Sequence, residues 1–388
     1  MNSYLALPFS KCYNLDVTMK TFKFRIYPTK HQTSFLEFTL EECRYLYNKL
    51  LEQRKYAWEI QGVSLNLKIQ QKLLPSLKRF HQNFKIINAA VLQNVNSRVD
   101  FAFKSFFKRV KSGGKPGYPR FKGKGNYDSI TFPQVPKGCQ IKNEKLVVDK
   151  IGHIKIKQHR KLEGKPKTAT IKRSHTGKWY VTFICEVERK VLPFNKNKVG
   201  IDVGIKSFAV LSDNTSINNP KFFRNEEKEL VRIQRRFDKT KKGTIERIKR
   251  KKVVSRIHER IRFKRENFIH QESRKIVDNY GIICVEDLTI TRMVKNHNLA
   301  KSIADAAWSG FFNKLSYKAE SAGRLFVKVN PAYTSRDCHK CGNRQKLTLA
   351  DRIYDCPVCG LHIDRDLNSS FNILRLGMQS LNLRSESP

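Results

Sequence analysis

The sequence lacks any run of about 18 apolar residues, the length that a membrane-spanning helix requires. We therefore expect no membrane-spanning segment. The first 18 residues also lack the basic start and the long apolar centre of a signal peptide. Because "MKTFKFRIYPTKHQ" resembles a true start at Met19, residues 1–18 are interpreted as a leader or an upstream-start extension.

Acidic residues are few, with 34 Asp and Glu against 77 Lys and Arg, which gives a net charge of +43. A folded surface this basic repels itself unless a polyanion neutralises it. Neutralisation of phosphates releases counterions, so nucleic acid is the expected partner; a basic protein of membrane surfaces or ribosomes is the alternative. The length of 388 residues and the 39% of hydrophobic residues indicate a globular protein of two to three domains.

Cysteines with the spacing of a disulfide framework are also missing. Four of the nine cysteines form two C-x-x-C pairs, and five are scattered without paired spacing. The scattered ones are Cys12, Cys43, Cys139, Cys185 and Cys284. Most are interpreted as reduced structural residues, so the composition favours a cytoplasmic protein over a secreted one.

The first half of the chain predicts a helical block between strands. Residues 21–27 alternate like a strand, and Thr29 with Gln32 has the spacing of a helix capping box. Residues 31–111 are predicted to be helical, and short strands dominate residues 129–190. The strands suggest a small β-barrel or sandwich, which the first strand would complete. The clearest apolar helical face, expected to be core, is Leu92, Val95, Val99, Phe103, Phe106 and Val110.

A glycine-rich loop, residues 111–129, interleaves basic residues with Tyr118, Phe121 and Tyr127. Such rings can stack on unpaired bases while basic groups follow the backbone. An ordinary solvated loop explains the composition equally well, so both interpretations stay open.

Carboxylates in apolar strands form a second set of candidate residues. Asp202 lies in the apolar segment of residues 199–203, and we interpret Gly200 and Gly204 as leaving room beside its carboxylate. Residues 280–288, "YGIICVEDL", predict a buried parallel strand that delivers Glu286 at its carboxyl end. A carboxylate in such a setting is costly unless it is paired or bound to a metal.

Between these two strands the chain becomes helical and strongly basic. Residues 225–275 contain 19 Lys or Arg against eight Asp or Glu. A charge run of this kind is often only a solvated face. The excess has one sign, so a helical pair that contacts phosphates is the favoured interpretation.

The segment "SRDCHKCGNRQKLTLADRIYDCPVCGLHIDRDLN" contains both C-x-x-C pairs. Four thiolates satisfy tetrahedral zinc and leave no open position, so the predicted role is structural. Unmetallated, redox-active thiols are the alternative. His339 and His362 lie nearby, but four sulfur ligands leave them no role. The predicted zinc ligands are Cys338, Cys341, Cys356 and Cys359.

Acidic residues from distant segments can together build a two-metal site. Asp202, Glu286 and the "DRD" at 364–366 are separated by about eighty residues each. Two Mg²⁺ ions held by such oxygens would stabilise the attacking and leaving oxygens of phosphodiester cleavage. Acidic residues at strand ends without a metal are common, so the pattern alone leaves this open.

The motifs resemble those of the TnpB family, the accessory "transposases" of insertion sequences related to miniature type V CRISPR effectors. The resemblance covers Met19 to about Leu376. It is carried by "GIDVGIKSFAV", "VEDLTITRMVKN", "LAKSIADAAWSGFFNKLSYKAE", "PAYTSRDCHKCG" and "CPVCGLHIDRDLNSSFNIL". It departs from the family ending D-x-N-A-A-x-N-I only in Ser369 and Ser370, which replace two alanines.

The resemblance implies an α/β and α+β multidomain protein. Its parts would be a RuvC-like nuclease of RNase H fold with an inserted four-cysteine zinc ribbon, and an N-terminal wedge-like β-barrel with an inserted helical recognition lobe. The implied boundaries are 19–30 and 115–192 for the barrel, 31–114 for the lobe, 196–330 and 361–376 for the nuclease, 331–360 for the ribbon and 377–388 for a tail.

By the same resemblance, Asp202, Glu286 and Asp366 match the catalytic carboxylates that bind magnesium or manganese, and Asp364 is the less favoured third ligand. The ribbon is expected to hold the adjoining helix so that Asp366 reaches the metals. The implied function is transposon-encoded, RNA-guided DNA cleavage by a cytoplasmic protein, a monomer with a guide RNA from the element's own end, acting on double-stranded DNA. A transposase or recombinase without guide RNA, and a guide-dependent repressor, are the alternatives.

Overall fold

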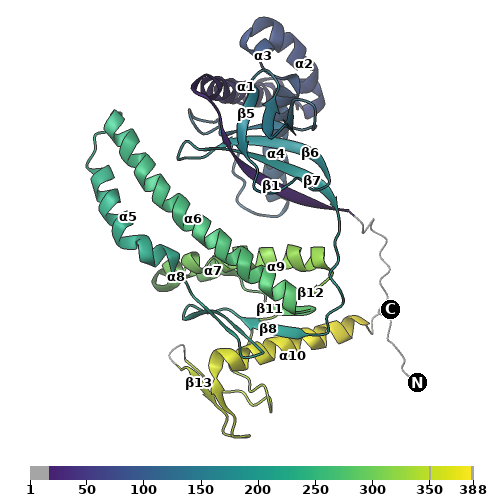
Figure 1. The fold of residues 1–388 in the computed structure, drawn as a ribbon, viewed down its shortest axis with the longest axis vertical. Coiled ribbons are helices and arrows are strands. Elements are labelled where there is room, and N and C mark those ends of the chain that lie inside the picture. Colours follow the sequence, from purple (N-terminus) through teal and green to yellow (C-terminus); the bar gives the residue numbers. More distant parts are fainter. Residues whose placement is uncertain (1–16, 349–350, 386–388) are drawn as a thin grey trace. The chain divides into compact units, whose positions relative to one another are not determined.

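The computed structural model describes residues 17–348 and 351–385 (Figure 1). The chain divides into two compact units, one of residues 16–188 and one that contains residues 189–388. Most of the predicted leader, residues 1–16, lies outside the described residues, whereas Val17 and Thr18 already pair with strand β7 (Trp179–Glu188). No helix in the described ranges is long and apolar enough to cross a membrane. The prediction of a multidomain α/β protein is confirmed.

The unit of residues 16–188 is built on a seven-stranded antiparallel sheet with the order β2-β6-β7-β1-β5-β4-β3. Strand β1 is therefore central, although it comes first in the chain. Among the described residues no backbone pairing joins the outer strands β2 and β3, so closure into a barrel stays a prediction. Besides β7, the strands are β1 (Val17–Tyr27), β2 (Ser129–Phe132), β3 (Cys139–Lys142), β4 (Lys145–Val148), β5 (Gly152–Lys157) and β6 (Lys165–Arg173).

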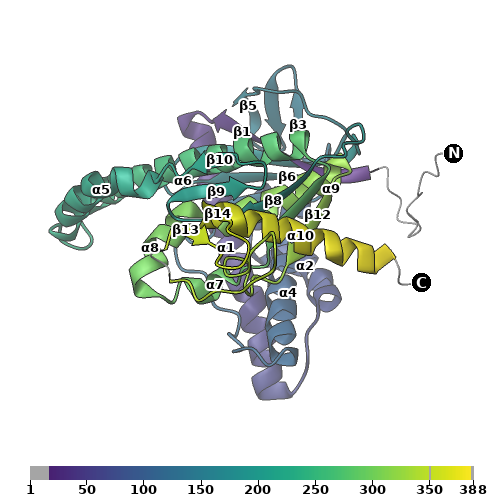
Figure 2. The ribbon, with the colours of Figure 1, turned by 90° about the horizontal axis from the view of Figure 1, so that it is seen from below.

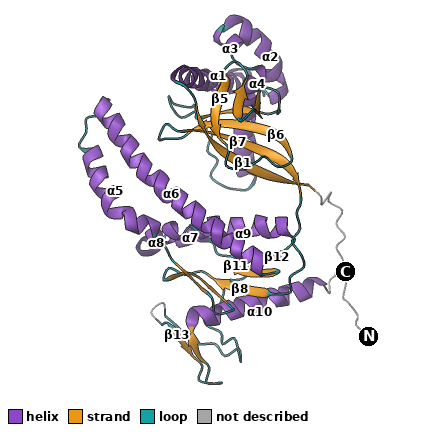
Figure 3. Ribbon diagram, in the orientation of Figure 1, coloured by secondary structure: helices purple, strands orange, loops and turns teal. Residues whose placement is uncertain are grey.

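Helices occupy the chain between β1 and β2 (Figure 3). The predicted capping box is present: Thr29 Oγ1 accepts the N–H of Gln32 at 3.2 Å, and Gln32 Oε1 accepts the N–H of Thr29 at 3.0 Å. The helices are α1 (Lys30–Gln61), α2 (Leu67–Phe80), α3 (Asn83–Ile86) and α4 (Ala89–Lys111).

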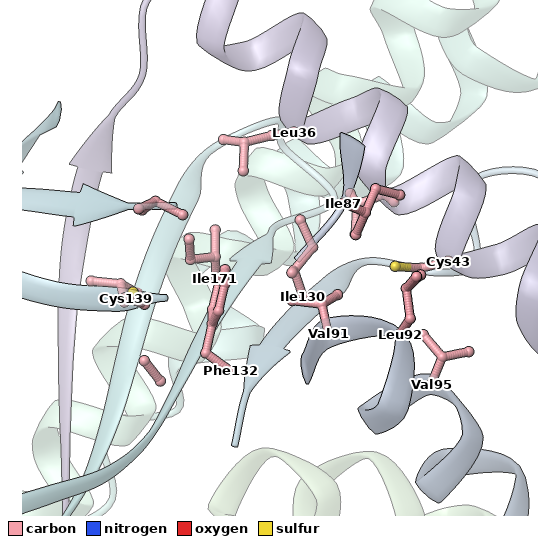
Figure 4. Packing of buried hydrophobic residues seen from close by; sticks show 14 of the residues in the cluster. Leu36, Cys43, Ile87, Val91, Leu92, Val95, Ile130, Phe132, Cys139 and Ile171 are labelled. Atoms are coloured by element: carbon pink, nitrogen blue, oxygen red, sulfur yellow. The ribbon is translucent and has the colours of Figure 1, made fainter. Parts of the chain in front are cut away.

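Helices and sheet of this unit share one hydrophobic core (Figure 4). Leu92, Val95 and Val99 of the predicted helical face are at most 2% exposed, and Ile130 packs in the same cluster from β2. The face ends before Val110, which is 47% exposed. The predicted core stripe is therefore correct for the first three turns of α4 and wrong at its end, where the helix extends beyond the core.

The second unit contains a mixed five-stranded sheet with the order β10-β9-β8-β11-β12. The strands β10, β9 and β8 are antiparallel, whereas β11 lies parallel between β8 and β12. Parallel neighbours need crossover connections, and helices supply them here. The strands are β8 (Lys198–Asp202), β9 (Ser207–Leu211), β10 (Ser216–Asn218), β11 (Ile282–Glu286) and β12 (Leu325–Val329).

Both faces of this sheet are covered (Figures 1 and 2). Ile283 and Val285 face a cluster with helices α6 (Ile245–Asn279) and α9 (Trp308–Ala322), while Cys284 packs with Ile373 of α10 (Arg365–Ser385). Burial on both faces explains the uninterrupted apolar sequence of β11. The helix α10 continues through Ser385, so the predicted tail from residue 377 is helical over most of its length.

The backbone of α10 touches β8 without an intervening side chain. A Cβ at Gly200 would lie 2.0 Å from the carbonyl oxygen of Ser370 and 2.6 Å from the nitrogen of Leu374. Gly200 therefore makes room for a helix. The prediction that it leaves room beside the carboxylate of Asp202 is wrong. Gly204 does lie beside a carboxylate, since its Cβ position is 3.7 Å from Asp366 Oδ2.

Candidate active site and metal centre

Two adjacent parallel strands bring Asp202 and Glu286 together. Ile201 of β8 is in register with Val285 of β11, so the next residues of both strands emerge at the same edge of the sheet. Asp202 is half-buried, and Glu286 is only 8% exposed. The expectation that β11 is a buried parallel strand ending in a carboxylate is confirmed.

Asp366, in the first turn of α10, joins these two carboxylates. Burial raises the pKa of Asp202 well above its usual value, and the charges of Glu286 and Asp366 add to that rise. Arg365 and the backbone N–H of Val203 act in the opposite direction. Three segments that are distant in sequence thus place like charges close enough to disfavour one another's ionisation.

Asp364 has a different task from Asp366. Its Oδ1 accepts the backbone N–H groups of Asp366 at 2.9 Å and Leu367 at 3.2 Å, so it caps α10 and is exposed. The Asp366 side chain is 17% exposed and lies beside Arg365, whose Nη2 is 3.3 Å from Asp366 Oδ1. This geometry favours Asp366 over Asp364 as the third carboxylate of the cluster.

The donor set of the three carboxylates fits hard divalent cations, because Mg²⁺ prefers carboxylate oxygen and retains several waters. Their oxygens are not all within 4.8 Å of one another, a distance that only the four cysteines satisfy in the described part of the chain.

The four predicted cysteines do converge on one point. Cys338 Sγ lies 3.6 Å from Cys359 Sγ, and Cys341 Sγ lies 3.5 Å from Cys356 Sγ. All four sulfurs lie within 4.8 Å of one another. With metal–sulfur distances of about 2.3 Å, sulfurs at the corners of a tetrahedron are about 3.8 Å apart, so the cluster fits a tetrahedral ion.

Glycines shape both cysteine turns. Gly342 and Gly360 have φ values of +78° and +67°, in the left-handed region that side chains rarely adopt. Their N–H groups donate to the carbonyls of Cys338 and Cys356 at 2.9 and 3.0 Å. The turns therefore close so that both thiols of each C-x-x-C pair point to the same side.

The two histidines near the cysteine cluster have other partners. The ring of His339 stacks on Phe371 of α10 with centroids 4.6 Å apart, and its Nδ1 is 3.0 Å from Asn368 Oδ1. His362 pairs with the exposed Asp355 across the hairpin of β13 (Ile353–Asp355) and β14 (His362–Asp364). The geometry supports the prediction that neither histidine is a metal ligand.

Sequence reasoning missed the buried polar residues that join the ribbon to the sheet and to α10. The side-chain amide of Asn368 donates to the carbonyl of Asp337 at 2.8 Å, and that of Asn372 donates to the carbonyls of Thr334 and Asp337 at 3.0 and 2.6 Å. Thr334 in turn donates to Glu286. Asn368 and Asn372 lie one helical turn apart, and this spacing was the signal in the sequence that could have found them.

The other described cysteines are structural. Cys43, Cys139, Cys185 and Cys284 are fully buried, and burial raises the pKa of the first, second and fourth thiols to about 12. Such thiols are poor nucleophiles. Cys12 lies outside the described residues.

The predicted basic helical pair is an antiparallel hairpin of α5 (Phe222–Asp238) and α6. The buried side chains of Leu230, Ile257 and Ile261 pack between the two helices. At its base, Asp305 of α8 (His297–Ala306) accepts the N–H of Phe223. The shorter α7 (Ile290–Met293) precedes α8. Many basic side chains of the hairpin are exposed and have no acidic partner among the described residues. They are Arg232, Arg235, Arg236, Lys239, Lys241, Lys242, Lys249, Lys251, Lys252 and Arg256.

The aromatic residues of the loop at 111–129 are divided in their roles. Tyr127 is 7% exposed and stacks on Arg98, so it is a core residue and cannot stack on bases. Tyr118 packs edge-on against Phe106 but is 42% exposed, and Phe121 is 52% exposed. Only Phe121 and part of Tyr118 are open to a partner.

Three family models match separate segments. A model described as "Probable transposase" matches residues 182–297, and one described as "Cas12f1-like, TNB domain" matches residues 308–373. A "Helix-turn-helix domain" model matches residues 18–62, where the structure has β1 followed by the single long helix α1. That description therefore does not fit the local fold.

A protein of Streptomyces pristinaespiralis, described as "Putative RNA-guided DNA endonuclease", is 33% identical over 367 residues, which cover 92% of this chain and 89% of the relative. A "TnpB-like protein L770" of Acanthamoeba polyphaga mimivirus is 26% identical over 399 residues, covering 92% and 73%. The chain belongs to the TnpB family. The resemblance that its motifs indicated is confirmed.

The fold of this TnpB-family chain is also found among solved structures. The Cas12f1 protein in a Cas12f1–sgRNA–target DNA complex matches 92% of this chain and 98% of its own length, with a TM-score of 0.58 and 17% identity. At that identity the likeness shows a shared fold.

Proposed function

We propose that this TnpB-family protein is an RNA-guided DNA endonuclease that cleaves target DNA at Asp202, Glu286 and Asp366. The observation that carries the proposal is the convergence of these three carboxylates from two parallel strands and one helix. Relatives are named as RNA-guided DNA endonucleases, and family membership supports the same activity here. The order β10-β9-β8-β11-β12 supports a RuvC-like, RNase H-type nuclease core.

In the mechanism, the chain's own residues hold charge at one edge of the sheet. Asp202 and Glu286 supply oxygen ligands from fixed strand ends, and Asp366 supplies a third from α10. Two divalent cations, magnesium or manganese, would stabilise the attacking and leaving oxygens of the scissile phosphodiester. Burial and mutual repulsion of the carboxylates favour such cations, because a bound cation removes the cost of keeping the carboxylates ionised.

The four-cysteine cluster has a separate, structural role in the proposal. Zinc bound by four thiolates has no open position for substrate. With zinc bound, the ribbon would hold the turn at Asp337 in place. The side-chain amides of Asn368 and Asn372 of α10 donate hydrogen bonds to the carbonyl of Asp337 in this turn. The ribbon thus supports the helix that carries Asp366. The strand β14 extends to Asp364, so the hairpin of β13 and β14 adjoins this helix directly.

Guide RNA and double-stranded DNA are the proposed partners. In guided cleavage, base pairing reads sequence while the protein supplies backbone contacts. The net charge of +43 and the exposed cations of the α5–α6 hairpin suit that task. The proposal also includes a wedge-like domain and a helical recognition lobe within residues 19–192.

The test is to purify the full chain, sequence the RNA that accompanies it, and reprogram that RNA toward a chosen duplex. Cleavage at the programmed site, abolished by Asp202→Ala without loss of bound RNA, is the expected result. Protein that carries no RNA and still cuts DNA would overturn the guided assignment.

Transposition without a guide is the second candidate, favoured by the match to the "Probable transposase" model. It requires strand transfer and not only cutting. A strand-transfer assay without RNA separates the two candidates. A guide-dependent repressor is disfavoured, because all three carboxylates are present.

A further inference from the structure

Thr334 makes a short, buried contact with one of the proposed catalytic carboxylates. Its Oγ1 lies 2.5 Å from Glu286 Oε1, and Thr334 is 3% exposed. The same oxygen lies 3.1 Å from the carbonyl of Pro331. A hydroxyl has one proton to donate, and an ionised carboxylate is a stronger acceptor than a carbonyl, so the Thr334 hydroxyl donates its hydrogen bond to Glu286.

The turn that carries Thr334 is fixed from two sides. Asn372 of α10 binds the carbonyls of Thr334 and Asp337, while Arg344 of the ribbon pairs with Asp337 at 2.6 Å. Arg344 also stacks on Tyr333, 3.6 Å from its ring centroid, and Tyr333 has a φ of +67°. A side chain held in the left-handed region requires surroundings that determine the backbone firmly.

We propose that Thr334 is a positioning residue, whose hydroxyl holds Glu286 in the orientation that presents its second oxygen to the divalent cations. The inference rests on the proposed nuclease function. It assigns the ribbon a second connection to the active site: α10 carries Asp366, and the turn before Cys338 orients Glu286.

The need for such a residue follows from the position of Glu286. A glutamate has three side-chain torsions, and the last of them is broad, so the carboxylate plane is set by the groups that bind it. Partners that hydrogen-bond a ligating carboxylate fix its direction, and their loss typically costs about 10–100-fold in metal affinity or activity. Thr334 is the described residue that donates a side-chain hydrogen bond to Glu286.

The alternative is that Thr334 only stabilises the turn, through Pro331 and Asn372. Thr334→Val removes the hydroxyl while keeping the shape of the side chain. Thr334→Ser keeps the hydroxyl and removes a methyl group. The main-chain bond from Asn372 is retained in both variants, so they differ in the donor to Glu286.

Wild type, Thr334→Val and Thr334→Ser should be prepared as full chains with their co-purified RNA. We expect Thr334→Val to lower the single-turnover cleavage rate about 10–100-fold and to raise the Mg²⁺ concentration for half-maximal rate. Zinc content, bound RNA and melting temperature should stay as in wild type. Thr334→Ser should restore the rate to within about threefold and restore the Mg²⁺ dependence.

Binding of Mn²⁺, followed by electron paramagnetic resonance on the same complexes without cleavage, gives a second measurement. It reports on the carboxylates even if no programmed cutting is observed, so failure of the proposed function is distinguishable from failure of this inference. Equal Mn²⁺ affinity in wild type and Thr334→Val would overturn it. Loss of zinc together with activity in Thr334→Val, or no rescue by serine, would assign Thr334 to the turn alone and would also overturn it.

Discussion

The carboxylate of Asp364 accepts the backbone N–H of Asp366 at 2.9 Å. One aspartate thereby begins the helix on which the other is presented to Asp202 and Glu286. The two residues have the same chemistry and are separated by one position, yet only Asp366 is half-buried beside the other carboxylates. Because Asp364 and Asp366 differ in environment but not in chemistry, substitutions at these two positions can be compared directly.

We expect Asp366→Ala to reduce guided cleavage about a hundredfold or more, because loss of a ligand removes several kcal/mol of charge stabilisation. Asp364→Ser should keep cleavage near wild type, since serine also caps helices. Asp364→Ala should cost about 1 kcal/mol of stability through loss of the cap. Single-turnover cleavage and thermal melting measure the two effects, and equal loss of cleavage in Asp364→Ser and Asp366→Ala would contradict the assignment.

Substitution of one ribbon cysteine tests the link between ribbon and active site. Cys356→Ser should lower the zinc content and the cleavage rate together, because three thiolates hold zinc poorly and the turn at Asp337 then loses its support. Inductively coupled plasma mass spectrometry and single-turnover cleavage are the measurements. His362→Ala is the matched control and should keep its zinc, since His362 contacts Asp355 instead. Unchanged cleavage in a zinc-free Cys356→Ser protein would refute the link.

Two glycines of the second unit should respond oppositely to alanine. Gly200→Ala places a methyl group 2.0 Å from the carbonyl oxygen of Ser370, and such overpacking typically costs about 1–3 kcal/mol or more. Gly310→Ala, within α9, meets only Ile269 Cδ1 at 3.7 Å and should stabilise the helix by roughly 0.5–1 kcal/mol. Thermal melting should therefore shift downward for the first and upward for the second. A tolerated Gly200→Ala would show that α10 does not rest on β8 as described.

The α5–α6 hairpin should contribute to salt-dependent binding of nucleic acid. Lys249 and Lys252 are exposed, lack acidic partners in the described residues and lie one turn apart, so Lys249→Gln with Lys252→Gln should reduce the slope of log affinity against log salt by about 1–2. The control is Arg274→Gln with Lys275→Gln, whose cations already pair with Asp278 and Glu272 at 2.7 and 2.8 Å. Affinity for the co-purified RNA over a salt series is the measurement, and identical slopes in both double variants would exclude this part of the hairpin.

The sequence predicted elements whose cause is local. The capping box at Thr29 follows from a three-residue spacing, and the strand β11 follows from an apolar run that must be buried on both faces. The cysteine cluster follows from two C-x-x-C pairs, because each pair forms its own turn. Each of these features is determined by residues only a few positions apart.

The sequence could not predict contacts between distant segments. The role of Gly200 depends on a helix about 170 residues further along the chain, and that of Thr334 depends on Glu286, 48 residues earlier. For Tyr127 the sequence left base stacking and an ordinary loop position equally open, whereas its ring is buried in the core. Burial of an individual side chain in a loop is decided by tertiary packing, which composition does not report.

The raised pKa of Asp202 means that burial, together with the nearby charges of Glu286 and Asp366, disfavours its ionised form in the folded chain. At neutral pH, which is above the unfolded pKa of a carboxyl, the cost of keeping this buried carboxylate ionised beside like charges opposes folding. Activity and heat resistance are therefore in conflict at this edge of the sheet. Asp202→Asn, which keeps the side-chain volume and removes a charge, should melt at a higher temperature than wild type in a chelating buffer. The most durable form of the protein would be one that can no longer cut.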